Sequence, residues 1–260
     1  MTRTYIGIDI GGTNTRIVLL RGFRRQRTTP TVFRTPKSRR AIEAALVRAI
    51  RGLVVRERIA GIGVAVAGAV DGTGRLASTK HLPLHKGWSP DVLRRTFRAP
   101  VRAENDARCF LHAEMRWGSA RRKHDVAGVA IGTGIGGALV INGKMQRGVH
   151  GSMGEVGKIG MGRGKSFEAL GAKRAFERWG DRSSVIGHGV ASIVSVLDPE
   201  MVVLGGGAVA ARKVRLSVVR RVVRQFAATP ASRTPVVFGT LGDAAQAIGA
   251  ALLFAIPSGR

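Results

Sequence analysis

Two hairpins with glycine-rich turns, one near the start of the chain and one near its middle, most constrain the fold. The strand-like runs Tyr5–Ile10 and Thr15–Leu20 are separated only by Gly11-Gly12-Thr13-Asn14, which predicts an antiparallel hairpin. The runs Val126–Ile131 and Ala138–Ile141 are separated in the same way by a second glycine-rich segment. A chain of 260 residues is long enough for two lobes of roughly 100–150 residues each. We therefore expect an α/β protein with two halves, each opened by a hairpin.

The rest of the chain alternates between helix-like and strand-like segments. Ser38 is predicted to cap an amphipathic helix, and Ser89-Pro90-Asp91 is a further helix start with an acidic residue in its first turn. The predicted helices cover residues 39–54, 107–117, 167–179, 184–197, 214–226 and 244–254, and the further predicted strands cover 59–67, 101–104, 201–204 and 236–238.

The first glycine turn has the composition of a phosphate-binding loop. Adjacent glycines allow the backbone N–H groups of Gly11 and Gly12 to close on a phosphate, and Thr13 and Asn14 add side-chain donors. Asp9, at the end of the preceding strand, is placed to hold a hydrated Mg²⁺ against those phosphates. An ordinary hairpin turn would need one glycine and no neighbouring acid.

Two further glycine segments predict nucleotide contacts. The segment Gly132–Gly137 satisfies the dinucleotide pattern G-x-G-x-x-G, but a strand-like run follows it where that pattern requires a helix. We interpret it as a second phosphate-binding hairpin. Gly205-Gly206-Gly207 follows a strand and offers a flat surface to a nucleotide base or ribose. The phosphate-binding candidates in the second hairpin are Gly132, Thr133, Gly134 and Gly136.

Five motifs, taken in order, resemble those of the ROK family of repressors, open reading frames and sugar kinases, and the resemblance covers essentially the whole chain. It implies an actin-like (ribonuclease-H-like) two-lobe ATPase fold with a central cleft that holds ATP, Mg²⁺ and a hexose. The implied N-terminal lobe is 1–107, completed by 243–260, and the C-terminal lobe is 108–242. The motifs are Asp9–Thr13, Glu104-Asn105-Asp106-Ala107, Gly132–Gly137, His150-Gly151 with Gly154-Glu155-Val156-Gly157, and Val203–Gly207.

The chemistry of a kinase assigns a role to the Asn-Asp pair. A sugar hydroxyl must lose its proton to a base while it attacks the terminal phosphate. Asp106 is the candidate base, because a helix N-terminus keeps a carboxylate ionised. Asn105 beside it is expected to orient the accepting hydroxyl. Simple helix capping is the alternative use of both residues.

The sugar site is implied by residue-by-residue matches to the family. Glu155 matches the sugar-binding glutamate of Gly-x-x-Gly-Glu-x-Gly-His, and Glu168 matches the second sugar glutamate. Gly68 lies in the upstream sugar loop, in an Ala-Gly where a Pro-Gly is common, and 80–83 is Lys-His-Leu-Pro where an Asn-Leu-Pro-like stretch is typical. His150 is a further candidate for sugar contact.

The family's zinc ligands are missing. Lys158 stands where the family has histidine, and the Cys-x-Cys-x₄-Cys segment is absent, since the chain has one cysteine, Cys109. We therefore expect no zinc site and a short loop over 160–165.

Three functions remain from the sequence. Only eight residues precede Asp9, which is too few for the DNA-reading domain of the family's repressors, so no specific DNA binding is expected. The favoured function is an ATP-dependent hexose kinase, glucokinase-like, acting on the 6-hydroxyl of glucose. The alternatives are a kinase that uses polyphosphate as donor, and a non-catalytic module that binds sugar or nucleic acid.

The charge is unusual: 43 lysines and arginines face 16 acids, for a net charge of +27. Such a field attracts polyanions, although the basic clusters are scattered along the chain instead of gathered in one arm. No apolar run reaches the length of a membrane span and no signal peptide is recognisable. We expect a cytoplasmic protein that does not bind membranes and forms a homodimer.

Overall fold

The computed structural model describes residues 2–54, 57–79 and 82–255. The chain divides into two compact units: Met1–Ala113 with Ala244–Arg260, and Glu114–Asp243. Lys80 and His81 of the predicted sugar loop lie outside the described residues. Within the described residues, the helices are all too short or too polar to cross a lipid bilayer.

The first unit is built on a five-stranded sheet of order β3-β2-β1-β4-β7. β1 and β2 form the predicted hairpin, with Ile10 opposite Thr15 next to the turn, while β1, β4 and β7 run parallel. The carboxyl ends of the three parallel strands therefore meet at one edge of the sheet. The bounds are β1 Thr4–Ile10, β2 Asn14–Arg21, β3 Thr31–Arg34, β4 Ile59–Val66 and β7 Val101–Asn105, with a small hairpin of β5 Ala69–Val70 and β6 Leu76–Ser78.

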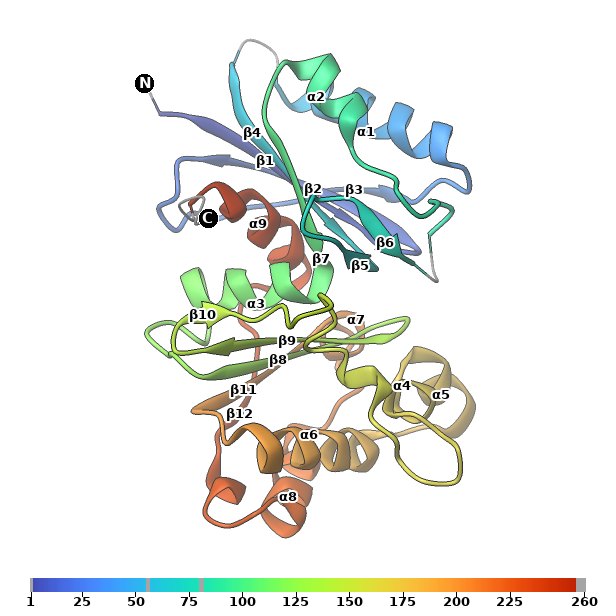
Figure 1. The fold of residues 1–260 in the computed structure, drawn as a ribbon, viewed down its shortest axis with the longest axis vertical. Coiled ribbons are helices and arrows are strands. Elements are labelled where there is room, and N and C mark those ends of the chain that lie inside the picture. Colours follow the sequence, from blue (N-terminus) through green and yellow to red (C-terminus); the bar gives the residue numbers. More distant parts are fainter. Residues whose placement is uncertain (1, 55–56, 80–81, 256–260) are drawn as a thin grey trace. The chain divides into compact units, whose positions relative to one another are not determined.

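Helices cover both faces of this sheet (Figure 1). Side chains alternate between the two faces along a strand, so Ile6 and Ile8 of β1 are in one apolar core with Ile42 and Leu46 of α1. On the other face, a Cβ on Gly63 of β4 would lie 1.8 Å from a backbone oxygen of α9. Only glycine allows this close contact. The helices are α1 Arg39–Leu53, α2 Asp91–Phe97, α3 Asp106–Trp117 and α9 Ala245–Ala251, the last followed by η4 Leu252–Ala255.

The second unit has the same strand pattern, β10-β9-β8-β11-β12. β8 and β9 form the second predicted hairpin, and β8, β11 and β12 run parallel. One core joins this sheet to α4, α6 and α8 and includes the fully buried Phe167. The elements are β8 Val126–Ile131, β9 Ile135–Ile141, β10 Lys144–Met145, η1 Val156–Lys158, α4 Phe167–Gly171, α5 Lys173–Trp179, α6 Ser183–Leu197, β11 Met201–Gly205, α7 Gly207–Ala210, α8 Leu216–Phe226, η2 Ala231–Arg233, β12 Val236–Phe238 and η3 Gly242–Ala244.

Some predicted boundaries are wrong. The helix predicted over 167–179 is two helices, because Ala172 between α4 and α5 is extended and the Lys173 N–H donates to the carbonyl of Gly132 instead of continuing α4. β9 begins at Ile135, three residues earlier than predicted, so Gly136 belongs to a strand and not to the turn. The helix predicted from 214 begins at Leu216. The short strands β3, β5, β6 and β10 were not predicted.

Candidate active site

The carboxyl edge of the first sheet brings together the predicted residues of that unit. Asp9 of β1 is level with Ala65 of β4, which is level with Glu104 of β7. Asn105 and Asp106 follow Glu104 directly, and Gly11 follows β1. Since neighbouring strands are about 4.8 Å apart, the first glycine loop and the Asn-Asp pair lie on the order of 10 Å from each other.

The first glycine loop is braced from β3. The Gly11 N–H donates to the Asn14 carbonyl at 3.1 Å, which closes the turn. The buried Thr35 donates its hydroxyl to the Gly11 carbonyl at 2.6 Å and its N–H to the Thr13 carbonyl at 3.0 Å. The Thr35 hydroxyl is also 2.9 Å from that of Thr15. Sequence reasoning missed Thr35, because it follows a strand that the sequence did not predict.

Asp9 is suited to hold Mg²⁺ beside a phosphate. Its side chain is 9% exposed and lies 3.8 Å from the guanidinium of Arg16. Within the described residues, His, Cys, Asp and Glu do not gather in groups of three that could form a protein cage for a metal. Protein-bound Mg²⁺ beside phosphates needs only one or two carboxylates and keeps several waters. A single carboxylate next to the loop that is predicted to bind phosphate therefore fits this ion.

Asn105 connects the helix to the predicted sugar loop. Its side-chain oxygen accepts the N–H of Arg108 at 3.1 Å, which caps α3, and its Nδ2 donates to the Gly68 carbonyl at 3.0 Å. An amide nitrogen has two N–H donors, so within the part of the chain that the structure describes the second one remains for a ligand. The capping alternative considered for Asn105 is thus observed, and it leaves a hydroxyl contact open.

Asp106 is the first residue of α3. Its carboxylate accepts its neighbour's N–H, that of Ala107, at 2.9 Å, and the side chain is only half-buried. The positive end of the helix dipole favours the ionised carboxylate at this position. An ionised, accessible carboxylate is what a general base requires.

A buried ion pair holds the backbone beneath these two residues. The Glu104 carboxylate accepts the N–H of Asn105 at 2.8 Å and faces the Arg108 guanidinium at 3.2 Å. Both side chains are nearly inaccessible, at 3% and 5% exposed. Glu104 thereby fixes the strand-to-helix junction from which Asp106 projects.

In the second unit, Glu168 contacts the second glycine hairpin. Its carboxylate accepts the Ile135 N–H at 3.0 Å. Gly132 is held by its own N–H to the Gly134 carbonyl at 2.8 Å. Thr133, at the tip, is exposed. Glu168 therefore shapes the loop that the sequence assigns to phosphate, in addition to its predicted role with sugar.

Glu155 and His150, the other two predicted sugar contacts of this unit, differ in their surroundings. Glu155 is exposed and directly precedes η1, which packs on β9 next to the glycine hairpin. His150 is exposed, and among the described residues it is the His150 carbonyl, not the imidazole, that makes a hydrogen bond, accepting from the hydroxyl of Ser152 at 3.5 Å. The structure therefore brings Glu155 to the same part of the unit as Glu168, but gives His150 no imidazole partner there.

The third glycine segment lies beside the second hairpin. Gly206 has φ +88° and a Cβ there would lie 2.6 Å from the carbonyl oxygen of Ile131, the last residue of β8. Both the left-handed backbone and the close contact require glycine. Gly205 pairs with Ala130 in the sheet, so Gly205-Gly206-Gly207 and Gly132 share one edge of the second unit.

The short loop predicted over 160–165 is closed by its own backbone. Gly160 and Ser166 form an antiparallel bridge, and the Met161 N–H donates to the Lys165 carbonyl at 2.8 Å. Ser166 then caps α4 by accepting the Ala169 N–H. These bonds close the loop locally.

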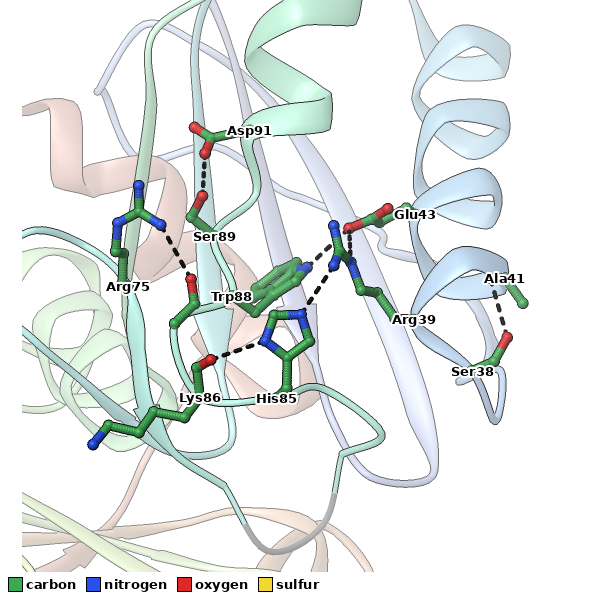
Figure 2. A network of polar contacts seen from close by, with 11 residues as sticks. Ser38, Arg39, Ala41, Glu43, Arg75, His85, Lys86, Trp88, Ser89 and Asp91 are labelled. Carbon is green, nitrogen blue, oxygen red and sulfur yellow. Dashed lines mark hydrogen bonds and ion pairs between the residues drawn. The ribbon is translucent and has the colours of Figure 1, made fainter.

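A polar network attaches the segment after β6 to α1, as Figure 2 shows. The indole N–H of buried Trp88 donates to Glu43 at 3.0 Å, and Arg39 donates to the same carboxylate oxygen at 2.9 Å. Arg39 also lies 2.9 Å from Nε2 of His85. Guanidinium groups only donate, so Nε2 of His85 is an acceptor in this network. The chain after the predicted sugar loop is thereby held against a helix.

Comparison with known proteins gives consistent matches. The family model described as ROK family matches residues 5–173 and 165–256. The glucokinase of Streptomyces coelicolor is 32% identical over 160 residues, which cover 60% of this chain and 49% of that enzyme. The chain thus aligns with about half of that relative's length.

Two solved structures have similar folds. A ROK family glucokinase from Streptomyces griseus, in complex with glucose and AMPPNP, has a TM-score of 0.83 at 24% identity and covers 96% of this chain and 98% of its own. An inorganic polyphosphate/ATP-glucomannokinase from Arthrobacter sp. strain KM has a TM-score of 0.77 at 25% identity, with coverages of 97% and 98%.

Proposed function

Because the chain belongs to the ROK family and is a sugar kinase, a phosphotransferase with an alcohol acceptor, we propose that it transfers the terminal phosphate of ATP to the 6-hydroxyl of glucose. The two-unit α/β architecture, with its actin-like ATPase fold, confirms the fold class predicted from the sequence. The sugar, the donor and the roles of individual residues belong to the proposal.

One observation carries the proposal: the first glycine loop and Asp106 lie at the same edge of one sheet, two strands apart. A strand spacing of about 4.8 Å leaves room on the order of 10 Å for a phosphate and a sugar hydroxymethyl group side by side. A phosphate-binding loop with no carboxylate nearby would serve binding alone.

Asp106 acts as the general base in this proposal. Its carboxylate accepts the proton of the sugar hydroxyl as that oxygen forms a bond to the terminal phosphorus. The bond from phosphorus to the bridging oxygen of the donor breaks, and ADP departs with that oxygen. Asn105 directs the hydroxyl with the N–H that Gly68 does not use.

Nucleotide phosphates are held by backbone donors. In the first loop, the contacts to phosphate would come from Gly11, Gly12, Thr13 and Asn14. Asp9 would hold a hydrated Mg²⁺, and the ion would neutralise charge on the phosphates. In the second unit, the proposed phosphate contacts come from Gly132, Thr133, Gly134 and Gly136. The proposed adenosine contacts come from Gly205, Gly206 and Gly207.

Sugar hydroxyls are bound by carboxylates. Glu155 is exposed and accessible to a ligand. One oxygen of Glu168 accepts the Ile135 N–H, and among the described residues the other oxygen is left for a ligand. Gly68 presents the sugar loop through its contact with Asn105. His150 completes the proposed set from an exposed position.

The test is a coupled assay of purified protein with a panel of hexoses and amino sugars, run with Mg·ATP and then with polyphosphate. We expect the highest kcat/KM for glucose with ATP, and a product phosphorylated at the 6-position by NMR. The same assay at about 50 and 200 mM salt separates the donors, because contacts to many phosphates weaken steeply with salt. A higher kcat/KM with polyphosphate than with ATP at the higher salt would show that polyphosphate, not ATP, is the preferred donor. Polyphosphate is the alternative tested because the similar Arthrobacter enzyme is named for both donors.

We also propose that the protein forms a homodimer, and light scattering of the purified protein would test this.

A further inference from the structure

A basic groove lies at the amino end of the first unit's sheet, away from the glycine loop. It has a volume of about 820 Å³ and its lining includes Arg3, Arg21, Arg58 and Arg98, with Glu57 as the acidic residue among the described lining. A volume of this size suits a small-molecule ligand. Four guanidinium groups around one groove attract an anion with several negative charges.

The groove contains one internal ion pair. Glu57 accepts from Arg21 at 2.7 Å and from the hydroxyl of Thr4 at 2.6 Å. The Arg21 hydrogen bond and the Thr4 hydroxyl both hold the pKa of Glu57 below its ordinary value, with the Thr4 bond as the larger cause. Glu57 therefore neutralises one arginine and fixes its orientation.

The other three guanidinium groups have no acidic partner among the described residues. Arg3, Arg58 and Arg98 all have exposed side chains at the groove. An arginine fork matches a phosphate oxygen pair in a bidentate geometry. Acidic side chains of the described residues do not neutralise the positive charge of these three arginines. That charge is therefore available to an anionic ligand.

The backbone at the groove is irregular in two places. Thr4 pairs with Ile59 but Tyr5 pairs with Gly61, so the ladder between β1 and β4 skips Ala60, which lines the groove. Such a bulge leaves a residue outside the ladder and is frequent beside binding sites. Arg98, which ends α2, has φ +48°, a conformation that usually selects glycine at a helix end.

The groove is a separate place from the glycine loop. β1 runs from Thr4 at the groove to Ile10 at the loop. At about 3.3 Å per residue, the two ends are on the order of 20 Å apart. A small ligand in the groove would not reach the loop.

We propose that this groove binds a small anion with a terminal phosphate group, such as an oligophosphate or a phosphorylated sugar. Arg3, Arg58 and Arg98 bind the phosphate oxygens. The apolar wall, which includes Pro100, contacts the remainder of the ligand. This inference is independent of the proposed catalytic function, because it requires neither Asp106 nor the glycine loops.

The test is isothermal titration calorimetry with tripolyphosphate and, separately, with glucose 6-phosphate. The groove variant is Arg58→Ser/Arg98→Asn, since asparagine tolerates the left-handed backbone. The control variant is Arg221→Ser/Arg224→Ser, which removes the same charge from the exposed face of α8. We expect the groove variant to bind about tenfold or more weakly and the control variant to change by less than about twofold.

Hydrogen exchange supplies a second readout. Bound ligand is expected to protect peptides over residues 2–6 and 57–62 in the unaltered protein. If ligand affinity falls equally in the groove and control variants, binding reflects the protein's general positive charge and the proposal is overturned. Hydrogen-exchange protection confined to residues 9–14 would also overturn it, because the ligand would then bind at the glycine loop. If the groove variant fails to fold by circular dichroism, Arg3→Ser replaces it with the same expectation. Tighter binding of tripolyphosphate would identify the ligand class as inorganic oligophosphate, and tighter binding of glucose 6-phosphate would identify it as phosphorylated sugar.

Discussion

The carboxylate of Glu114 accepts the backbone N–H of Leu241 at 3.0 Å across a sequence separation of 127 residues. The same fully buried side chain also accepts the N–H groups of Ser119 and Thr240 and the hydroxyl of Ser119. Glu114 and Asp243 are the first and last residues of the second unit. One carboxylate therefore fastens the two segments through which the chain enters and leaves that unit.

Glu114→Gln is expected to reduce the free energy of unfolding by about 2–3 kcal/mol. The amide would place N–H groups against backbone N–H donors, and a buried donor without an acceptor is costly. Urea denaturation followed by circular dichroism gives the difference. The matched control is Glu177→Gln, whose exposed pair with Lys173 at 3.6 Å should contribute less than about 0.5 kcal/mol. Equal stability of the two variants would contradict the proposed fastening.

Asp106→Asn is expected to fold normally and to lose kcat by about 10²–10⁴-fold, because the shape remains while the base is removed. Steady-state kinetics with the preferred hexose measures this loss. Asp198→Asn is the control, since Asp198 is exposed and its left-handed backbone suits asparagine. A near-native kcat for Asp106→Asn would reject Asp106 as the base.

Asp9→Asn is expected to raise the Mg²⁺ concentration needed for half-maximal activity, because a neutral amide holds hydrated Mg²⁺ less strongly than a carboxylate does. Activity measured over a Mg²⁺ series should recover at high concentration. The variant Asp198→Asn should follow the unaltered protein throughout. An unchanged Mg²⁺ dependence in Asp9→Asn would remove Asp9 from the proposed ion site.

The purified protein is expected to contain no stoichiometric zinc. Lys158 provides an ammonium where the family has a histidine ligand, and the loop from Gly160 to Ser166 closes through its backbone. Elemental analysis before and after dialysis against a chelator measures this. One zinc per chain that survives dialysis would refute the interpretation of Lys158.

Ser89→Ala is expected to destabilise the protein at neutral pH but not in strong acid. The Ser89 hydroxyl is the main cause that lowers the pKa of Asp91, with Arg94 adding a smaller effect. A lowered folded-state pKa stabilises the protein above the unfolded value, about 3.9, and this stability is lost as pH falls through the folded value. The effect should stay below about 1 kcal/mol, because Asp91 is 36% exposed and solvent screens it.

The measurement is the free energy of unfolding between about pH 2 and 7, with Ser217→Ala on the exposed face of α8 as control. A carboxyl NMR titration should place the Asp91 pKa higher in Ser89→Ala. A stability difference that grows as the pH falls has the opposite sign and would exclude this linkage.

Local patterns predicted the hairpins and most helices, because alternating strands and glycine turns are encoded within a few residues. The break at Ala172 was not predictable from its neighbours, since the Lys173 N–H pairs with Gly132, which is distant in sequence. β3 was missed because it is short, and its Val32 is 51% exposed, which obscures the apolar alternation of a strand.

The candidate site likewise has features that the sequence predicted and features that it did not. Asp9 and the Asn-Asp pair stand at strand ends that the sequence marks. Their shared edge was not predicted, because the parallel order of β1, β4 and β7 depends on pairing between strands that are distant in sequence. Thr35 carried no signal, because its hydroxyl donates to the Gly11 carbonyl from a position after β3 that is distant in sequence. The bond from Glu168 to the Ile135 N–H was equally hidden, since a glutamate in a first helical turn has many other uses.

The contact of α9 with Gly63 of β4 has a consequence for folding during synthesis, because α9 is made last and packs on a sheet that is made first. The second unit is one continuous segment, Glu114–Asp243, whereas the first unit needs residues from both sides of it. On the ribosome, β1, β2, β4 and β7 are made first, but one face of their sheet stays uncovered until α9 emerges. The later-made unit is therefore the first whose residues are all available for folding, whereas α9 can cover the earlier-made strands only after it has been synthesised.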